Sequence, residues 1–409
     1  MKKLGLLRLI VPGLIAHPLA SPSNVSHDEL STQSHAYSGT PGTAGSHTLT
    51  TEGVAHTNQN AATSCDLYVS PTGSDLSSGT VTAPWQTVQH TFDNVQPGQT
   101  VCFRAGTYPL TVSSGYNQRL KNSGTSSSPI TFTNYPGEVA IIHGNTLVAG
   151  AYVTFVGTPA VAPGFIFEGP TGQALDIVDI LNTHDVTFDH VEIRNGDYHA
   201  GLYQSGGYNI KLIGCYVHDN GRPGYINSDQ GIYWDATTGG GNLIANCVVE
   251  HNVSAGIQLY PSPSQVTVEE NTIVNNGNYG AVVYGDQNAI VNNIFSGNGV
   301  IANNPQMEVD SGTNHVIDSN IFWSSTASLQ GYINLTNVPV THSLNTNPLF
   351  VDPANHNYHL QAGSPAIKAG NASYAQLEDK DGIQRDSPSD LGAYGYTPPF
   401  AILLENGVR

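Results

Sequence analysis

Apolar side chains alternate with polar ones in six segments of the chain that align in one register. The segments are residues 186–195, 210–219, 242–251, 266–275, 288–297 and 315–324. Such alternation predicts β-strands with one buried face. Three aligned columns are mainly apolar or small: Phe188, Leu212, Ile244, Val268, Ile290 and Ile317; Val191, Cys215, Cys247, Asn271, Asn293 and Asn320; and Ile193, Val217, Val249, Ile273, Phe295 and Phe322.

Successive members of the first column lie 24, 32, 24, 22 and 27 residues apart. One coil of a parallel β-helix takes about that many residues, and stacked coils bury a shared core between neighbours. We therefore predict an all-β solenoid, a right-handed parallel β-helix. The alternative is a β-sandwich of hairpins, whose turns recur every ~8–12 residues without such fixed columns. The alignment disfavours that fold.

A second strand is expected in four coils, where it opens with Gly201, Gly231, Gly256 or Gly280. The residue after each Gly and the one two positions later are predicted to face inward. The turn after the first strand carries, in successive coils, Asn220, Asn252, Asn276 and Asn298. Because Asn tolerates left-handed backbone angles and stacked Asn side chains can hydrogen-bond between coils, we expect both roles at these turns.

One coil is longer than the others. Its spacing of 32 residues exceeds the neighbouring 24 by eight, and the extra residues fall in 218–230 and 235–241. Insertions in a solenoid form loops on one face, which is often the binding face. We therefore expect a functional site around residues 210–242.

The chain starts with two segments that are not expected to join the fold. Residues 1–20 combine Lys2 and Lys3 with a short, interrupted apolar run, which is typical of a secretory signal peptide and too short to span a bilayer. Residues 21–64 are rich in Ser, Thr, His, Gly and Asn, so we predict a disordered linker. From these two segments we expect a secreted or cell-surface protein without a membrane span.

The charge balance limits the classes of molecule that the chain is expected to bind. The 409 residues include 13 basic and 31 acidic ones, for a net charge of -18. Such a surface repels phosphate backbones, so we expect no nucleic-acid partner. It also repels polyanionic sugars unless a cation mediates. Gly and Pro are frequent and only 11 % of residues are charged, which suits short strands and tight turns better than helical bundles.

Two end motifs resemble a known group. Residues 66–108, with Val88, Phe92 and Val95 on one helical face, resemble the N-terminal helical cap of pectate-lyase-like β-helix proteins. Residues 347–396 resemble the C-terminal region called choice-of-anchor Q. We delimit the β-helix as 65–345, the C-terminal region as 346–398 and a tail as 399–409. The resemblance implies fold and export strongly and chemistry weakly, because such proteins include lyases, hydrolases and members without known activity.

The four cysteines form two expected pairs. Cys65 and Cys102 flank the cap strands and are predicted disulfide partners in an exported protein. Cys215 and Cys247 share an inward column on consecutive coils, about 4.8 Å apart. That separation permits a bond, but we favour two stacked reduced thiols. The absence of a C-x-x-C pair argues against zinc.

Polar residues gather around the long coil, although any solvated face carries such residues. Outward tyrosines offer flat apolar faces for stacking on sugar rings. The candidate substrate-binding residues are His199, Tyr203, Tyr233, Gln258, Tyr260 and Tyr284. The candidate catalytic residues are Lys211, His218, Arg222, Asp229 and Asp235, and the candidate metal ligands are Asp197, Asp219 and Glu250.

Two enzyme mechanisms compete for these residues. A polysaccharide lyase needs a base such as Lys211 or Arg222, with His199, His218 and His251 as alternatives, and charge neutralisation by Ca²⁺ on the acidic residues. A glycoside hydrolase needs two carboxylates, for which Asp229 and Asp235 are candidates, with Asp197, Asp219 or Glu250 as partners.

The resemblance favours the lyase, acting on a uronic-acid-containing polymer, and electrostatics favours a hydrolase acting on a neutral glycan. The third alternative is a non-catalytic surface adhesin or glycan-binding β-helix. In each case we expect a monomer that binds a polysaccharide. We rank the lyase first.

Overall fold

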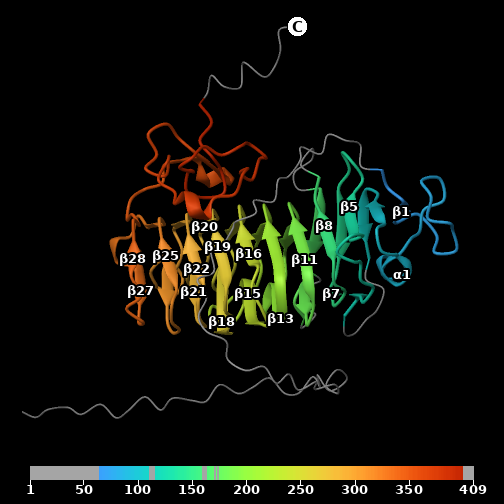
Figure 1. Cartoon of the computed structure of the whole chain (residues 1–409), viewed down its shortest axis with the longest axis horizontal. Coiled ribbons are helices and arrows are strands. Elements are labelled where there is room, and N and C mark those ends of the chain that lie inside the picture. Colours follow the sequence, from blue (N-terminus) through green and yellow to red (C-terminus); the bar gives the residue numbers. More distant parts are fainter. Residues whose placement is uncertain (1–63, 110–115, 159–163, 170–171, 173–174, 399–409) are drawn as a thin grey trace, which may run out of the picture. The chain divides into compact units, whose positions relative to one another are not determined.

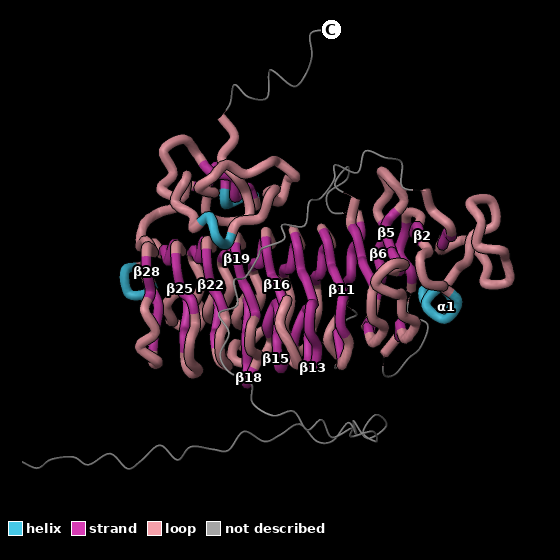
Figure 2. Tube along the Cα trace, in the orientation of Figure 1, coloured by secondary structure: helices cyan, strands magenta, loops and turns pink. Residues whose placement is uncertain are grey.

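The computed structural model describes residues 64–398, except 110–115, 159–163, 170–171 and 173–174. The expected signal peptide, nearly all of the linker and the tail therefore lie outside the described residues. The described chain coils through three faces of parallel strands, repeated along one axis (Figure 1). Strands dominate the coils, and helices are confined to four short segments of the described residues (Figure 2).

We number the faces in the order in which each coil visits them. Face 1 consists of β1 (Leu67–Val69), β2 (Thr100–Phe103), β5 (Ile130–Asn134), β8 (Val153–Val156), β11 (His184–Asp189), the second half of β13 (Ala200–Ile213), β16 (Asn242–Ala245), β19 (Val266–Glu269), β22 (Ala289–Val291), β25 (Val316–Asp318) and β28 (Val340–Thr341).

Face 2 consists of β3 (Gly106–Tyr108), β6 (Ala140–His143), β9 (Phe165–Glu168), β12 (Glu192–Arg194), β14 (Tyr216–His218), β17 (Val248–Glu250), β20 (Thr272–Val274), β23 (Ile294–Ser296) and β26 (Ile321–Trp323).

Face 3 consists of β4 (Gln118–Leu120), β7 (Thr146–Val148), β10 (Val178–Leu181), the first half of β13, β15 (Gln230–Thr237), β18 (Ile257–Ser262), β21 (Ala281–Val283), β24 (Met307–Val309) and β27 (Tyr332–Asn334).

The strand register confirms the predicted inward columns. On face 1, Phe188 pairs with Leu212, which pairs with Ile244, and the ladder continues to Ile317. On face 2, Ile193 starts the ladder that ends at Phe322. These side chains are buried and form one continuous core. The parallel β-helix is therefore a consequence of stacking equivalent apolar positions.

The predicted asparagine ladder is also present. Asn220 donates through Nδ2 to Asn252 Oδ1 at 2.9 Å, Asn252 does the same to Asn276, and Asn276 to Asn298. The prediction of left-handed angles at these residues is wrong. Those angles occur one residue earlier, at positions such as Asp219 (φ 53°). The preceding residue makes the turn, and the ladder Asn can therefore point inward.

This ladder supplies a first prediction. Replacing Asn276 by Ala leaves the buried amide groups of Asn252 and the backbone carbonyl of Val249 without their side-chain partners. We expect the free energy of unfolding to fall by about 2–4 kcal/mol, because buried polar groups are left unsatisfied. Urea denaturation measures this, with the exposed Asn345→Ala variant as control. A loss equal to that of Asn345→Ala contradicts the prediction.

The N-terminal cap agrees with expectation. Helix α1 (Val88–Asn94) is capped by Thr87, whose side chain accepts a hydrogen bond from the His90 amide. Val88, Phe92 and the C-cap Val95 are buried. The Phe92 ring packs edge-on against Phe132, with centroids 5.2 Å apart. The helix thus covers the apolar end of the core.

The cysteine predictions are confirmed as well. Cys65 and Cys102 form a disulfide between residues 37 positions apart in the sequence. Cys65 precedes β1, and Cys102 lies in β2. Cys215 and Cys247 are buried free thiols in consecutive coils. The disulfide joins the first coils, where fewer neighbouring coils share the core.

The C-terminal region folds against face 2 (Figure 1). It contains the antiparallel pair β29 (Phe350–Asp352) and β30 (Asn357–Leu360), and the short 3₁₀ helices η2 (Pro353–Asn355) and η3 (Ala372–Tyr374); a further one, η1 (Ala327–Leu329), precedes β27. Its side chains Phe350, Leu360 and Leu391 pack on the outward apolar residues of β17, β20, β23 and β26. Buried Arg385 pairs with buried Glu270 of the β-helix, Nε to Oε2 at 3.2 Å.

The long coil differs from expectation in one respect. Part of the extra segment 235–241 belongs to strand β15 instead of a loop, and the other extra residues form the turns before and after that strand. β15, with 8 residues, is much longer than the three-residue strand β21 further along face 3. The extra residues 235–237 therefore lengthen β15 on face 3. Among the described residues, none of the helices has the length and apolar character to cross a bilayer.

Candidate functional site on face 3

A row of aromatic side chains follows the outer side of face 3. Tyr203, Tyr233 and Gln258 occupy one register position on successive strands. The ring centroids of Tyr203 and Tyr233 lie 5.4 Å apart, and those of Tyr233 and Tyr260 lie 6.5 Å apart. Tyr284 continues the row at 4.8 Å from Tyr260. The structure thus brings together the substrate-binding residues expected from the sequence.

His199 lies beside the first two members of this row, Tyr203 and Tyr233. Its ring centroid lies 4.8 Å from that of Tyr233 and 5.7 Å from that of Tyr203, both edge-on. Its Nδ1 contacts Asp176 Oδ1 at 3.2 Å, and the same oxygen accepts the Ala200 amide at 2.6 Å. Burial lowers the pKa of His199, but the hydrogen bond and charge of Asp176 outweigh burial, so that the pKa is raised. The bond to Asp176 orients the imidazole.

Two further carboxylates lie on this face. Asp179, one strand before Tyr203 in the register, is buried, and Tyr116 hydrogen-bonds to it. Burial and then the charge of Asp176 raise its pKa well above the usual value. Asp235 accepts the Tyr203 hydroxyl at 2.9 Å and the Ser205 hydroxyl at 2.7 Å.

Sequence reasoning missed Asp176 and Asp179 because the alignment began at residue 186. One signal could have revealed Asp179, which precedes Tyr203 by the same 24 residues as the column spacing.

Arg222 and Asp229 form a partly buried ion pair beside His199. The guanidinium donates from Nε to Asp229 Oδ2 and from Nη2 to Oδ1, both at 2.7 Å. The guanidinium carbon of Arg222, Cζ, lies 4.5 Å from the ring centre of Tyr198 and 3.8 Å from that of Tyr225. Arg222 remains 30 % exposed, while the Asp229 side chain is fully buried. Arg222 therefore faces solvent, and Asp229 serves as its anchor.

Other expected site residues lie elsewhere. Lys211 belongs to the face 1 half of β13, where it pairs with Leu243. His218 lies on face 2, between Glu192 (3.1 Å) and Asp219 (2.7 Å), and these carboxylates raise its pKa to about 9 despite burial, which lowers it. The structure therefore places neither Lys211 nor His218 with the tyrosine row.

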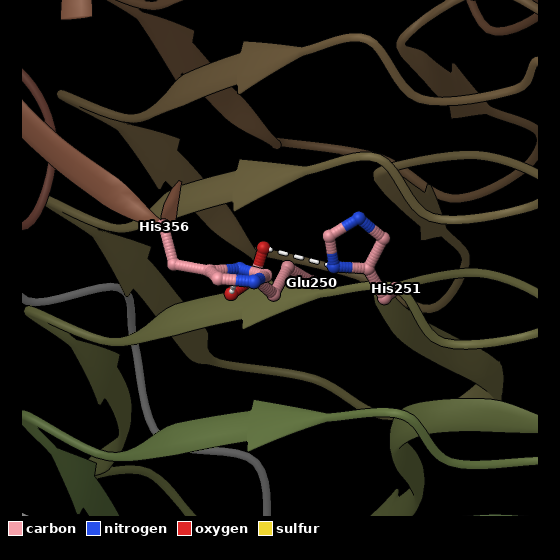
Figure 3. A group of neighbouring side chains, drawn as sticks. All are labelled: Glu250, His251 and His356. Carbon is pink, nitrogen blue, oxygen red and sulfur yellow. Dashed lines mark hydrogen bonds and ion pairs between the residues drawn. The ribbon is translucent and has the colours of Figure 1, made fainter. Parts of the chain in front are cut away.

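The three expected metal ligands do not converge. Asp197 accepts the Gly172 amide, and Asp219 binds His218. Glu250 lies beneath the C-terminal region, where it accepts the Tyr216 and Tyr358 hydroxyls and contacts His356 Nδ1 at 2.9 Å and His251 Nδ1 at 3.0 Å (Figure 3). Burial raises the pKa of Glu250, but these hydrogen bonds outweigh it and lower the pKa to about 2.

Calcium binds sets of about six to eight oxygen atoms. Among the described residues, the one group of three or more potential ligands with mutually close atoms is Glu250, His251 and His356, whose ligand atoms lie within 4.8 Å. Two of its members are imidazoles, which suit transition metals, and the carboxylate is already hydrogen-bonded. The residues expected from the sequence therefore do not fit a calcium shell.

Comparisons with known proteins agree on the fold. A Paenibacillus polymyxa protein named pectate lyase L is 24 % identical over 311 residues, which cover 71 % of this chain and 67 % of the relative. An Emericella nidulans protein named pectate lyase PEL9 is 35 % identical over 143 residues, 35 % of this chain and only 30 % of the relative. This chain therefore matches less than a third of that relative's length.

A crystal structure of pectate lyase Pel9A superposes with a TM-score of 0.57 at 17 % identity, covering 81 % of this chain and 96 % of that one. Residues 67–332 match the family described as "Pel9A-like, right handed beta helix region". That match spans more than half of the chain and nearly all strands of the solenoid. The chain belongs to the Pel9A-like right-handed β-helix family.

Proposed function

We propose that this chain is an exported polysaccharide lyase that cleaves a uronic-acid-containing polymer by β-elimination on the outer side of face 3. The observation that carries the proposal is the Asp176–His199 pair, which lies against the rings of Tyr203 and Tyr233. The guanidinium of Arg222 lies over the ring of Tyr198, the residue that precedes His199. The names of the two pectate lyase relatives support the same chemistry.

His199 is the base in this proposal. With its Nδ1 proton directed at Asp176, its Nε2 presents a lone pair for the proton α to the uronate carboxylate. The C5–H bond breaks, a C4–C5 double bond forms, and the bond from C4 to the leaving sugar oxygen breaks. Tyr233 supplies the proton for that oxygen. Burial, and then the charge of Asp235, raise the pKa of Tyr233, so its hydroxyl stays protonated.

Arg222 binds the uronate carboxylate in this arrangement. A chain of net charge -18 needs a local cation to accept an anionic sugar. The planar guanidinium of Arg222 lies against two tyrosine rings and already donates from Nε and Nη2 to Asp229, so its remaining N–H groups are held in place to donate to the uronate carboxylate. Tyr260 and Tyr284 extend the aromatic row and provide stacking positions for neighbouring sugars. No calcium step is included, because the expected ligands do not converge.

A glycoside hydrolase is the second candidate. The pair expected from the sequence is weakened, because Asp229 is buried in its ion pair with Arg222. One observation still favours a hydrolase: Asp179 has a raised pKa beside Asp176, a property of a general acid that cleaves glycosidic bonds. Asp179 would protonate the leaving oxygen of a neutral glycan.

One assay separates the candidates. The protein is incubated with uronic and neutral polysaccharides, with and without EDTA, and both the absorbance of the unsaturated product and new reducing ends are recorded. We expect absorbance and reducing ends to rise together on a uronic polymer. Reducing ends without that absorbance identify the hydrolase. If neither the absorbance nor the reducing ends rise with any polysaccharide, both enzyme functions are rejected and a glycan-binding protein is favoured. The EDTA arm tests the calcium dependence that the resemblance implies.

A further inference from the structure

A cavity lies away from face 3, between face 2 and the C-terminal region. Its volume is about 340 Å³. One wall is built from face 2, where Val274, Ser296 and Trp323 occupy equivalent register positions on β20, β23 and β26. The opposite wall is built from the C-terminal region, with Phe350 and Tyr358 among its residues. Segments far apart in sequence therefore form this pocket jointly.

None of the described residues that line the pocket is charged. The polar lining consists of side-chain amides and hydroxyls, including Asn275, Asn347 and Gln361. Amides offer both donors and acceptors, as sugar hydroxyls do. An anionic sugar would find no cation in this lining, so the pocket chemistry suits a neutral ligand.

The aromatic walls are held in place by neighbouring contacts. The Phe350 and Tyr358 rings meet edge-on, with centroids 5.2 Å apart. The Tyr358 hydroxyl is anchored on the buried carboxylate of Glu250. Gln361 donates through Nε2 to the Phe350 carbonyl at 2.7 Å, which fixes its amide at the pocket wall. A preformed pocket with an aromatic wall and fixed amides loses little entropy when it binds a ligand.

We propose that this pocket binds a neutral sugar unit of a polysaccharide, as an accessory site separate from face 3. Trp323 provides the stacking surface, and the amides of Asn275, Asn347 and Gln361 pair with the sugar hydroxyls. The proposal goes beyond lyase chemistry and does not depend on it. An accessory site of this kind holds a neutral part of a glycan while face 3 acts on another part.

Isothermal titration calorimetry of the full chain tests the site. The probes are galactotetraose, arabinotetraose, xylotetraose and cellotetraose, with tetragalacturonate as the charged comparison. We expect at least one neutral probe to bind. Trp323→Ala is expected to weaken that binding by about tenfold, the loss typical of a removed aromatic anchor. Ser325→Trp, which fills the pocket from an exposed position, is expected to have the same effect without removing a core contact.

The matched control is Ser325→Ala, which leaves the pocket open. His199→Gln is the second control, because it alters face 3 alone. Neutral-probe binding that survives Ser325→Trp, or that His199→Gln abolishes, overturns the proposal. So does failure of all four neutral probes to bind. Because binding is measured without turnover, these results are independent of whether the chain proves to be a lyase.

Discussion

Replacing His199 by Gln is expected to lower the proposed lyase activity by about 10²- to 10⁴-fold, the usual contribution of a general base. Gln keeps a similar size and polarity, but it cannot take a proton. The fold should persist, because His199 is a partly exposed residue at the surface of face 3. The rate of unsaturated product formation measures the effect, and circular dichroism checks the fold.

His184→Gln is the matched control. His184 also contacts a neighbouring carboxylate, with Nδ1 2.7 Å from Asp185, but it lies on face 1. Its replacement should leave the rate unchanged. Equal losses for both variants, or full activity of His199→Gln, would remove His199 from the mechanism.

The pH profile gives an independent readout of the same pair. His199 acts as a base only when it is neutral, and Asp176 raises its pKa above the ordinary value of about 6.5. Activity should therefore rise with pH, with a midpoint above about 6.5. Asp176→Asn should shift that midpoint to lower pH and also reduce the rate, because the imidazole loses its orienting partner. A midpoint unmoved by Asp176→Asn contradicts the assignment.

Replacing Glu250 by Gln is expected to destabilise the protein by about 3 kcal/mol at neutral pH. Glu250 is buried and accepts hydrogen bonds from two tyrosines, with two histidine nitrogens also in contact. Its pKa is lowered from 4.5 to about 2. A lowered pKa in the folded state contributes stability above the unfolded value, and that contribution is lost as the pH falls from 4.5 towards 2.

Chemical denaturation at pH 7 and near pH 2 measures this contribution. The difference between wild type and Glu250→Gln should be large at neutral pH and should shrink in acid, where the wild-type carboxyl also becomes neutral. The control is Asp386→Asn, which removes an exposed carboxylate of the C-terminal region, 3.5 Å from Lys368 Nζ. An exposed pair of this kind is worth about 0–1 kcal/mol. A Glu250 effect no larger than this, or one independent of pH, contradicts the prediction.

The histidines at Glu250 also bear on metal binding. Glu250, His251 and His356 present one oxygen and two nitrogens close together (Figure 3). The Glu250 carboxylate already accepts hydrogen bonds from these neighbours and from two tyrosines. The three residues are therefore explained as a structural contact between face 2 and the C-terminal region. They are separated by up to 106 residues in sequence. The sequence analysis proposed Glu250 as a metal ligand. In the tertiary structure, its carboxylate instead contacts Tyr358 and His356 and so helps to hold the C-terminal region on face 2.

The repeat by itself determined the fold, the inward columns and the aromatic row. Phe188 and Leu212 must stack because equivalent apolar positions of successive coils bury one another, and the same periodicity aligns Tyr203 with Tyr233. What the repeat cannot show is where each coil changes direction. Lys211 and Tyr203 are eight residues apart and belong to the same strand, β13, yet they lie on different faces.

That change of direction occurs between Gln204 and Tyr208, around Gly206, whose φ of 71° bends the strand from face 3 into face 1. Contacts between residues far apart in the sequence likewise cannot be predicted from the repeat. Asp176 reaches His199 across adjacent coils, and Tyr358 reaches Glu250 from a region that follows the solenoid. Local alternation therefore determined which side chains face inward. The tertiary structure decided which of the outward ones meet, because turn geometry and docking, rather than sequence spacing, bring them together.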